Sequence, residues 1–341
     1  MTLAEILQEA KKKSPRCRVC PVCNGIACKG EIPGLGGKGS GRSFIRNVQK
    51  LQEVRIRMDV LAENRPVETS STLFGHPVTL PVYCAPVAGI KNNYGADMSE
   101  EEYNKATVEG CLSAGTLAFT GDGIDIDELF SKPLQAVLDH DGMGIPTIKP
   151  WIEEGVQARI DRFQGHSVFA LATDVDAAGL VLLRQGTTPV VNKSIEDLRK
   201  MKAMAGGIPL IVKGIMTPES ALKCVEAGVD AIVVSNHGGR VLDDAEATIE
   251  VLPEIAAAVK GKLTILTDGG YRTGLDVFKA LALGADGVLI GRPLALAAIG
   301  GGSEGVRLAL EKIRNELRET MVMTGCSTIA EITADRVKTS W

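Results

Sequence analysis

The sequence predicts an α/β protein whose strands close into a (β/α)8 barrel, the TIM-barrel architecture. From about residue 80 onward, eight short apolar runs alternate with stretches of helical periodicity. The runs are apolar throughout rather than at every second residue, which indicates parallel strands buried on both faces. Polar residues and glycines gather where the runs end, as expected where the strands of a barrel share one rim.

The predicted strands are rich in Val, Ile and Leu. They are residues 80–88, 116–121, 145–151, 168–174, 210–214, 231–236, 263–270 and 287–292. Helical patterns follow them, among them residues 99–115, 217–228 and 274–285, and two of these end at glycine, as helices commonly do. Eight such units in series favour a closed barrel over an open Rossmann-like or flavodoxin-like sheet, which is the alternative.

Residues 1–79 precede the predicted barrel of residues 80–341 and are expected to form a leader. Residues 1–14 read as a short amphipathic helix and residues 43–59 as a second helix, with a Gly-rich stretch at 33–44 before it. Residues 34–39 match the pattern G-x-G-x-x-G, but no strand precedes them, so a dinucleotide site is rejected. The stretch is expected to be a mobile loop, with a lid over the site as its role.

Composition and charge exclude several classes of protein. The net charge of −4 supplies no basic field for nucleic acid. No apolar run is long enough to span a bilayer, and the N-terminus lacks the apolar core of a secretory signal. We therefore expect a cytoplasmic protein whose eight cysteines are thiols or metal ligands.

The strongest chemical signal is the segment VVSNHGGRVLDD, residues 233–244. His237 can exchange a proton near neutral pH, and Arg240 offers a planar fork that suits a carboxylate. Two glycines between them let the backbone bend sharply beside a ligand. The alternative is a simple turn in which Arg240 pairs with a following aspartate, but the position at a strand end favours a functional site.

This segment, together with residues 209–215 and 268–293, resembles the FMN-dependent 2-hydroxy-acid dehydrogenase family. That family includes glycolate oxidase, lactate oxidase and flavocytochrome-type lactate dehydrogenase. The resemblance implies that His237 takes the proton of the substrate hydroxyl, Arg240 binds the substrate carboxylate, and Asp174 orients His237. It also implies a small carboxylate substrate, an electron acceptor that the sequence does not name, and a homo-oligomer.

The resemblance further implies an FMN site along the rim. Lys213 would approach the pyrimidine end of the flavin, where a fixed cation stabilises negative charge on the reduced ring. The last two strands would hold the phosphate through glycine backbone and arginine side chains. The expected FMN contacts are Pro86, Ala88, Thr120, Lys149, Lys213, Ser235, Asp268, Gly270, Arg272, Gly291 and Arg292.

The sequence departs from the family pattern around the substrate. The family's N-terminal Tyr is absent, its Gln-x-Tyr on the third strand reads Lys149-Pro150-Trp151, and its second substrate arginine is missing. Losing a charged anchor costs on the order of 2–5 kcal/mol of binding. Trp151 is expected to contact the substrate. Lys149 supplies either a second carboxylate anchor or a contact to the flavin.

Four cysteines lie close together in the leader: Cys17, Cys20, Cys23 and Cys28. Thiols this close can bind zinc or an iron–sulfur cluster, and the spacing is nearer to ferredoxin runs than to zinc ribbons. The alternative is a set of reduced thiols in a flexible leader.

The predicted function is FMN-dependent oxidation of an (S)-2-hydroxy acid, lactate-like, to the 2-oxo acid. His237 would act as the base and flavin N5 would accept the hydrogen. A flavin-dependent isomerase resembling type 2 isopentenyl-diphosphate isomerase is one alternative, although the His-Gly-Gly-Arg segment speaks against it. A flavin or metal redox sensor is the other.

Overall fold

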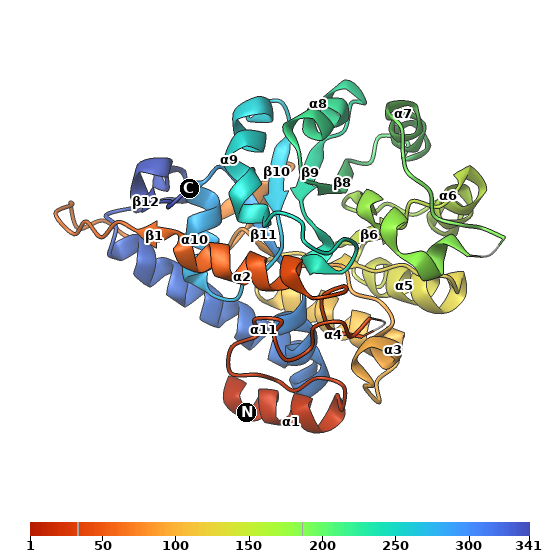
Figure 1. Ribbon diagram of the computed structural model, residues 1–341, viewed down its shortest axis with the longest axis horizontal. Helices are drawn as coiled ribbons and strands as arrows, with labels where there is room; N and C mark the ends of the chain where they lie inside the picture. The colour runs from red at the N-terminus through yellow and green to blue at the C-terminus, as the bar shows by residue number, and fades with distance from the viewer. Residues whose placement is uncertain (33, 186) are drawn as a thin grey trace.

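The computed structural model describes residues 1–32, 34–185 and 187–341, and a parallel eight-stranded barrel stands at its centre (Figure 1). Residue 33, the first of the predicted Gly-rich stretch, lies outside the described residues. The barrel strands are β4 (Val82–Cys84), β5 (Phe119–Thr120), β6 (Ile145–Ile148), β7 (Leu171–Asp174), β8 (Leu210–Ile215), β9 (Ala231–Val234), β10 (Thr264–Thr267) and β11 (Gly287–Ile290). Each overlaps one of the eight predicted runs.

The strands close into a ring, which confirms the barrel and excludes the open sheet. Strands β5 to β11 pair with their neighbours in chain order, and β11 pairs with β4. A parallel bridge between Cys84 and Ala118 joins β4 to the start of β5.

A helix follows each strand and covers the outside of the barrel. These helices are α4 (Glu100–Ser113), α5 (Lys132–Leu138), α6 (Glu153–Ile160), α7 (Ile195–Met204), α8 (Pro218–Glu226), α9 (Thr248–Val259), α10 (Gly274–Ala282) and α11 (Arg292–Val322). Polar caps fix several starts. At α4, the Ser99 hydroxyl accepts the Glu102 N–H while the Glu102 carboxylate accepts the Ser99 N–H.

Shorter elements connect these units. They are the helix α3 (Ile90–Tyr94), the π-helical turn η1 (Asp127–Ser131) and the 3-10 turns η2 (Asp161–Phe163), η3 (Val175–Gly179), η4 (Val181–Arg184), η5 (His237–Gly239), η6 (Ile329–Glu331) and η7 (Ala334–Arg336). Two of them, η3 and η5, follow β7 and β9 directly. They therefore lie on the rim formed by the carboxyl ends of the strands.

Alternate residues of each strand face the inside of the barrel, although both faces are apolar. In β9, Val233 belongs to the inner core cluster, whereas Ile232 and Val234 pack against the surrounding helices. In β8, Ile211 faces inward in the same way. Because side chains alternate with period two, the next inward positions are Ser235 and Lys213. The periodicity of the strands thus carries polar side chains to the mouth of the barrel.

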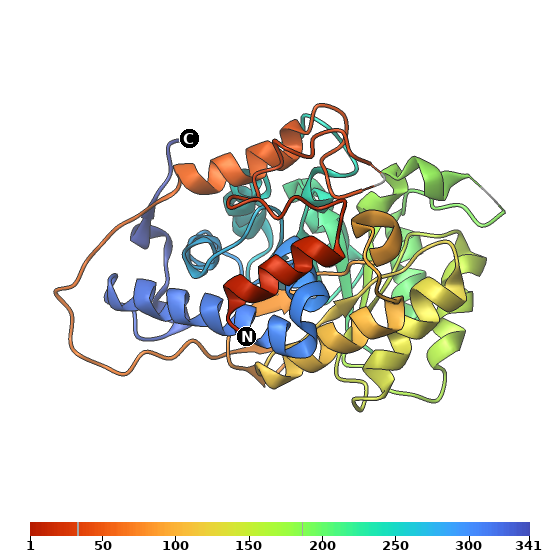
Figure 2. The ribbon, with the colours of Figure 1, turned by 90° about the horizontal axis from the view of Figure 1, so that it is seen from below.

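The leader packs against the barrel through its helices and short strands, whereas residues 57–66 form an exposed loop. The helix α1 (Leu3–Lys13) lies on α11 (Figure 2), where a Cβ on Gly300 would come within 2.0 Å of the Ile6 carbonyl oxygen. The strand β1 (Arg55–Ile56) pairs with β12 (Val337–Lys338), near the end of the chain. The hairpin of β2 (Ser71–Leu73) and β3 (His76–Val78) contributes Leu73 and Val78 to the inner core.

The second leader helix, α2 (Arg42–Glu53), crosses the barrel beside η5 (Figure 1). The prediction of one helix over residues 43–59 was wrong at its end. Val54 takes an extended conformation, and residues 55–56 pair with the C-terminal strand instead. No helix within the described ranges is long and apolar enough to cross a membrane.

Candidate active site

Four polar side chains meet at the mouth of the barrel, one from each of four consecutive strands or strand ends. They are Asp174, Lys213, Ser235 and Asp268, all buried. The Lys213 ammonium donates to the Ser235 hydroxyl at 2.8 Å and lies 3.4 Å from the Asp268 carboxylate. Burial alone would lower the pKa of Lys213, but the negative charges of Asp176 and Asp268 outweigh it and raise that pKa. Lys213 is therefore a fixed cation at the rim.

His237 forms its short contact with Asp176, not with Asp174 as the sequence predicted. Its Nδ1 lies 2.9 Å from an Asp176 carboxylate oxygen and 4.0 Å from the nearest Asp174 oxygen. Asp176 sits in the 3-10 turn η3, two residues beyond the end of β7. The expected orienting carboxylate is thus present but shifted by two positions. The sequence did contain a sign of this alternative, because Asp174-Val175-Asp176 offers two carboxylates where one was expected to orient His237.

The backbone at His237 is unusual for a residue with a side chain. Its φ is +56°, and Gly238 and Gly239 follow with φ of +63° and +79°. Residues other than glycine seldom adopt this region, and such strain gathers at functional sites. The Ser235 hydroxyl accepts the His237 N–H at 3.1 Å and helps to hold the turn. This turn fixes the imidazole on the rim beside Lys213 and Asp176.

The charges around His237 set its protonation state. Burial lowers the pKa of His237 most; the Asp176 carboxylate raises it, and Lys213 lowers it again, so the net shift is downward. Burial alone would raise the pKa of Asp176, but the positive charge of Lys213 and the interaction with His237, including its hydrogen bond, lower it to about 2. At neutral pH the imidazole is therefore neutral and its partner ionised, which is the state of a proton acceptor.

Lys149 reaches the same group of charges from β6. Its ammonium lies 2.5 Å from an Asp174 oxygen. Its backbone N–H donates to Asp122 at 2.8 Å, and Asp122 forms a buried ion pair with Arg159 at 2.7 Å. Sequence reasoning did not identify Asp122 or Arg159. They anchor the segment that carries Lys149.

The contacts of Trp151 give no support to the expected substrate contact, because its polar and stacking partners are Asp122 and Arg159. The side chain is 2% exposed, and its indole N–H donates to Asp122 at 2.6 Å. The Arg159 guanidinium stacks on the ring, 4.4 Å from its centroid. Trp151 therefore belongs to the buried support of this segment.

The three arginines expected to bind anions face the leader. Arg240 donates to the Gly34 carbonyl, and Arg292 donates to the Leu35 carbonyl at 2.9 Å. Arg272 donates to the Cys23 carbonyl at 3.2 Å. Burial and the charge of Arg292 lower the pKa of Arg240 to about 10, so Arg240 stays charged at neutral pH. The three guanidinium groups were expected to bind the phosphate of FMN and the carboxylate of the substrate. In the structure, backbone carbonyl oxygens of the leader accept their hydrogen bonds.

Phe44 lies between two of these arginines. Its ring centroid is 3.8 Å from Arg292 and 5.9 Å from Arg272. Lys38 donates its N–H to the Gly239 carbonyl at 2.8 Å, and Asp243 accepts the N–H groups of Ser40 and Arg42. The end of the Gly-rich stretch is therefore bonded to the His237 loop, as a structured cover rather than a loose loop.

Several buried polar atoms at the mouth have no hydrogen-bond partner among the described residues. At the rim they are Oγ1 of Thr147, one carboxylate oxygen each of Asp174, Asp176 and Asp268, and Nε of Arg272. Thr120 and Thr173 carry such atoms on the outward faces of β5 and β7, and others lie on Glu100, Tyr103, Ser131, Arg314 and Arg336. Buried polar atoms are otherwise nearly always paired. The unpaired atoms at the rim fit a polar ligand with many acceptors and donors, such as FMN.

The remaining expected FMN contacts also lie along this rim. Pro86 and Ala88 follow β4 and are half-buried, and Gly291 follows β11, where an added Cβ would meet Ala85 at 3.6 Å. Gly270 follows β10 with φ of +94° and packs against Asn47 of α2. The structure therefore gathers the predicted cofactor residues at one end of the barrel.

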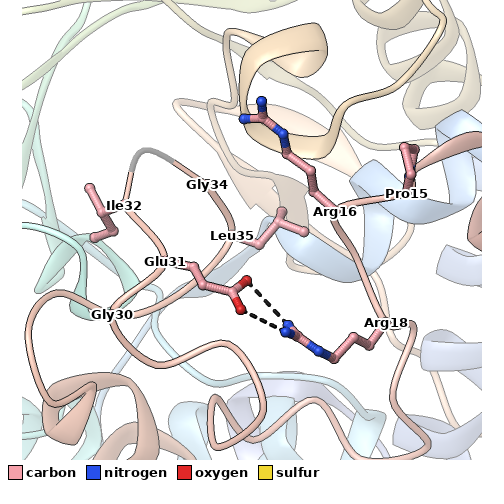
Figure 3. A pocket seen from close by; sticks show the side chains of 8 residues that line it. All are labelled: Pro15, Arg16, Arg18, Gly30, Glu31, Ile32, Gly34 and Leu35. Carbon is pink, nitrogen blue, oxygen red and sulfur yellow. Dashed lines mark hydrogen bonds and ion pairs between the residues drawn. The ribbon is translucent and has the colours of Figure 1, made fainter.

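A surface cavity of about 650 Å³ lies in the leader (Figure 3), and it is lined by Pro15, Arg16, Arg18, Gly30, Glu31, Ile32, Gly34 and Leu35. Arg18 and Glu31 form a two-fold hydrogen-bonded ion pair across it, at 2.7 and 3.2 Å. None of the rim residues lines this cavity. It belongs to the leader and lies apart from the buried polar side chains at the barrel mouth.

The part of the chain that the structure describes holds one group of three side chains close enough to share a metal ion: Asp174, Asp176 and His237. Lys149 and Lys213 already lie beside these carboxylates, which disfavours a cation there. The four leader cysteines do not form such a group as they stand. The structure therefore gives no support for a zinc ion held by these thiolates.

The model of the family described as FMN-dependent dehydrogenase matches residues 35–181 and 173–339. A peroxisomal (S)-2-hydroxyacid oxidase of Arabidopsis thaliana is 31% identical over 337 residues, which cover 89% of this chain and 90% of that protein. An L-lactate oxidase of Lactobacillus jensenii is 52% identical over 136 residues, which cover 40% of this chain and 33% of that protein.

Solved structures show the same architecture. A mandelate oxidase variant with (S)-mandelic acid superimposes with a TM-score of 0.76 at 27% identity, covering 99% of this chain and 97% of that one. A lactate oxidase of Pediococcus acidilactici gives a TM-score of 0.77 at 26% identity, covering 99% and 94% of the two chains.

Proposed function

Because the chain belongs to the FMN-dependent dehydrogenase family, whose members act on 2-hydroxy acids, we propose that it oxidises an (S)-2-hydroxy acid of the lactate kind to the 2-oxo acid. The contact between His237 and Asp176 beside Lys213 is the observation that carries this proposal. FMN, when bound, accepts the two electrons and the hydrogen that leave the substrate's α-carbon.

His237 takes the proton of the substrate hydroxyl. Its Nδ1 donates to Asp176, so Nε2 carries the lone pair that accepts the proton. The neutral imidazole is ready for this step because burial lowers its pKa. Once His237 is protonated, the Asp176 carboxylate stabilises its positive charge.

Arg240 binds the substrate carboxylate. It lies three residues beyond His237, and the Gly34 carbonyl and the Asn93 side chain orient its guanidinium. Lys213 holds a positive charge at the rim, where the ring of the bound cofactor gains negative charge on reduction. Lys149 and Asp174 form an ion pair, so neither side chain leaves an unpaired charge in the site.

A lactate-like substrate is favoured over a bulky one. The leader carbonyls of Gly34 and Leu35 accept hydrogen bonds from Arg240 and Arg292, so the leader covers the expected carboxylate anchor. The high identity of one segment to an L-lactate oxidase supports the same choice. We also propose that residues 1–79 act as a cover for the barrel of residues 80–341. Three further expectations stay predictions of the sequence: a cytoplasmic location, a homo-oligomer, and a metal centre at the leader cysteines.

The test compares His237→Asn with His166→Asn, an exposed histidine remote from the rim. Each protein is purified with its flavin, made anaerobic and mixed with L-lactate, glycolate or (S)-mandelate. We expect His166→Asn to bleach like the parent, fastest with L-lactate, and His237→Asn to bleach at least on the order of a hundredfold more slowly. A parent protein that binds flavin but is bleached by none of the three acids would overturn the proposal.

A further inference from the structure

The leader cysteines, Cys17, Cys20, Cys23 and Cys28, differ from the other cysteines of the chain. All four are half-buried, whereas Cys84, Cys111, Cys224 and Cys326 are buried in the barrel and its helices. The four lie in a loop segment between α1 and α2 that has no helix or strand of its own. A packed core therefore does not explain why this segment carries four thiols.

The four cysteines belong to one short run with the pattern C-x2-C-x2-C-x4-C, over residues 17–28. Cysteines this close along a chain can bind one metal centre, as C-x2-C pairs commonly do.

Two N–H donors lie against these sulfurs. Arg272 lies 3.6 Å from the Cys23 sulfur through its Nη2, and the Val19 N–H donates to the Cys17 sulfur at 3.4 Å. N–H donors and cations around sulfur are the features that stabilise a thiolate-bound, negatively charged metal centre.

The backbone between the first two cysteines is held in a strained turn. Val19 has φ of +45°, which is rare for a β-branched residue. The turn brings the Val19 N–H onto the Cys17 sulfur. Strain of this kind persists where the surroundings hold it, and a ligand bound by Cys17 and Cys20 would hold this turn.

Along the chain, the x2, x2, x4 spacing of the cysteines is nearer to ferredoxin runs than to zinc ribbons, which separate their cysteine pairs widely. Four thiolates on one zinc ion, at about 2.3 Å each, lie within about 3.8 Å of one another. No three of the leader sulfurs lie within 4.8 Å of one another in the part of the chain that the structure describes. An iron–sulfur cluster binds each thiolate through a different iron, so its ligands stand farther apart.

We propose that Cys17, Cys20, Cys23 and Cys28 bind an iron–sulfur cluster of the four-iron, four-sulfide class, beside the arginines at the edge of the barrel mouth. This site goes beyond the proposed oxidation and does not depend on it. The Arg272 guanidinium contacts both the carbonyl oxygen and the sulfur of Cys23. The Arg272 side chain therefore joins the cluster site to the expected phosphate site.

The test uses the full-length protein, expressed with added iron and purified without oxygen. Iron and acid-labile sulfide are measured per chain, and the dithionite-reduced protein is examined by electron paramagnetic resonance. We expect roughly four irons and four sulfides per chain and a signal of a reduced cluster. Cys20→Ser should lose at least half of the iron and the signal, whereas Cys224→Ser, at a buried core cysteine, should keep both.

Reconstitution keeps the test decisive if Cys20→Ser folds poorly. Chelator-treated parent protein is incubated with ferrous iron and sulfide, and recovery of the brown absorbance is followed. Any of three outcomes would overturn the proposal. They are iron at background in both preparations, equal iron in the parent and in Cys20→Ser, and stoichiometric zinc in place of iron. Flavin content and its bleaching by L-lactate, read on the same samples, report separately on the proposed oxidation.

Discussion

The side-chain amides of Asn47 and Asn236 donate a hydrogen bond to each other, at 2.8 and 2.9 Å, across 189 residues of chain. Both residues are buried. Asn47 lies on α2 of the leader, and Asn236 immediately precedes His237. The pair therefore fixes the leader to the loop that carries the proposed base.

Replacing Asn47 with Ala should destabilise the protein by about 1–3 kcal/mol, because the Asn236 amide and the Thr248 N–H both lose a buried partner. The free energy of unfolding in urea checks this. Asn192→Ala, at an exposed position, is the matched control and should change it by less than about 0.5 kcal/mol. Equal effects of the two substitutions would show that the pair does not hold the leader.

Asp176→Asn should slow substrate oxidation more than Asp174→Asn, because Asp176 makes the short contact to His237. We expect on the order of a hundredfold loss in the rate of anaerobic flavin bleaching for Asp176→Asn. The Asp176 carboxylate also raises the pKa of His237, so its loss should move the acid limb of the pH profile to lower pH. A larger loss of rate in Asp174→Asn would restore the assignment made from the sequence.

Lys149→Met should move the acid limb in the opposite direction. The Lys149 charge lowers the pKa of His237, so removing it raises that pKa, and the neutral base is lost at a higher pH. The pH dependence of kcat/KM measures the shift, with Lys149→Arg as the variant that keeps the charge. An unchanged acid limb in Lys149→Met would mean that Lys149 does not act on His237.

Gly239→Ala should prevent the leader from docking. The new Cβ would lie 2.4 Å from the Phe44 backbone nitrogen, in addition to the strain of φ at +79°. Gly228→Ala is the control, since its φ is +76° and its Cβ would meet nothing within 4 Å. We expect a loss of about 1–2 kcal/mol in the control and clearly more in Gly239→Ala. Thermal unfolding of both proteins separates the clash from the strain.

The barrel could be predicted from the sequence because its strands are apolar on both faces and its polar residues stand at the strand ends. Lys213 and Asp268 follow inward positions of their strands, so period-two alternation brings them to the mouth. The partner of His237 could not be predicted in the same way. Asp176 lies in a 3-10 turn, where strand periodicity no longer determines which carboxylate points inward.

The roles of Trp151 and the Gly-rich stretch were hidden for a different reason. The expected substrate contact of Trp151 assumed that the segment after β6 continues the strand. Instead, Trp151 contacts Asp122 and Arg159, which form an ion pair with each other and lie 29 and 8 positions away in sequence. The stretch beginning at Gly34 contacts arginines more than 200 residues later. Local patterns carry no information about contacts at such separations.

The leader precedes the barrel in the chain, yet its hydrogen-bond partners lie far downstream. Lys38 donates to Gly239, and Leu35 accepts from Arg292, which is 257 residues later. Closing loops of this length costs entropy that is recovered only once both ends are in place. The mouth of the barrel is therefore expected to be the last region to gain protection from amide hydrogen exchange during refolding. It is also the first region expected to lose that protection in mild denaturant.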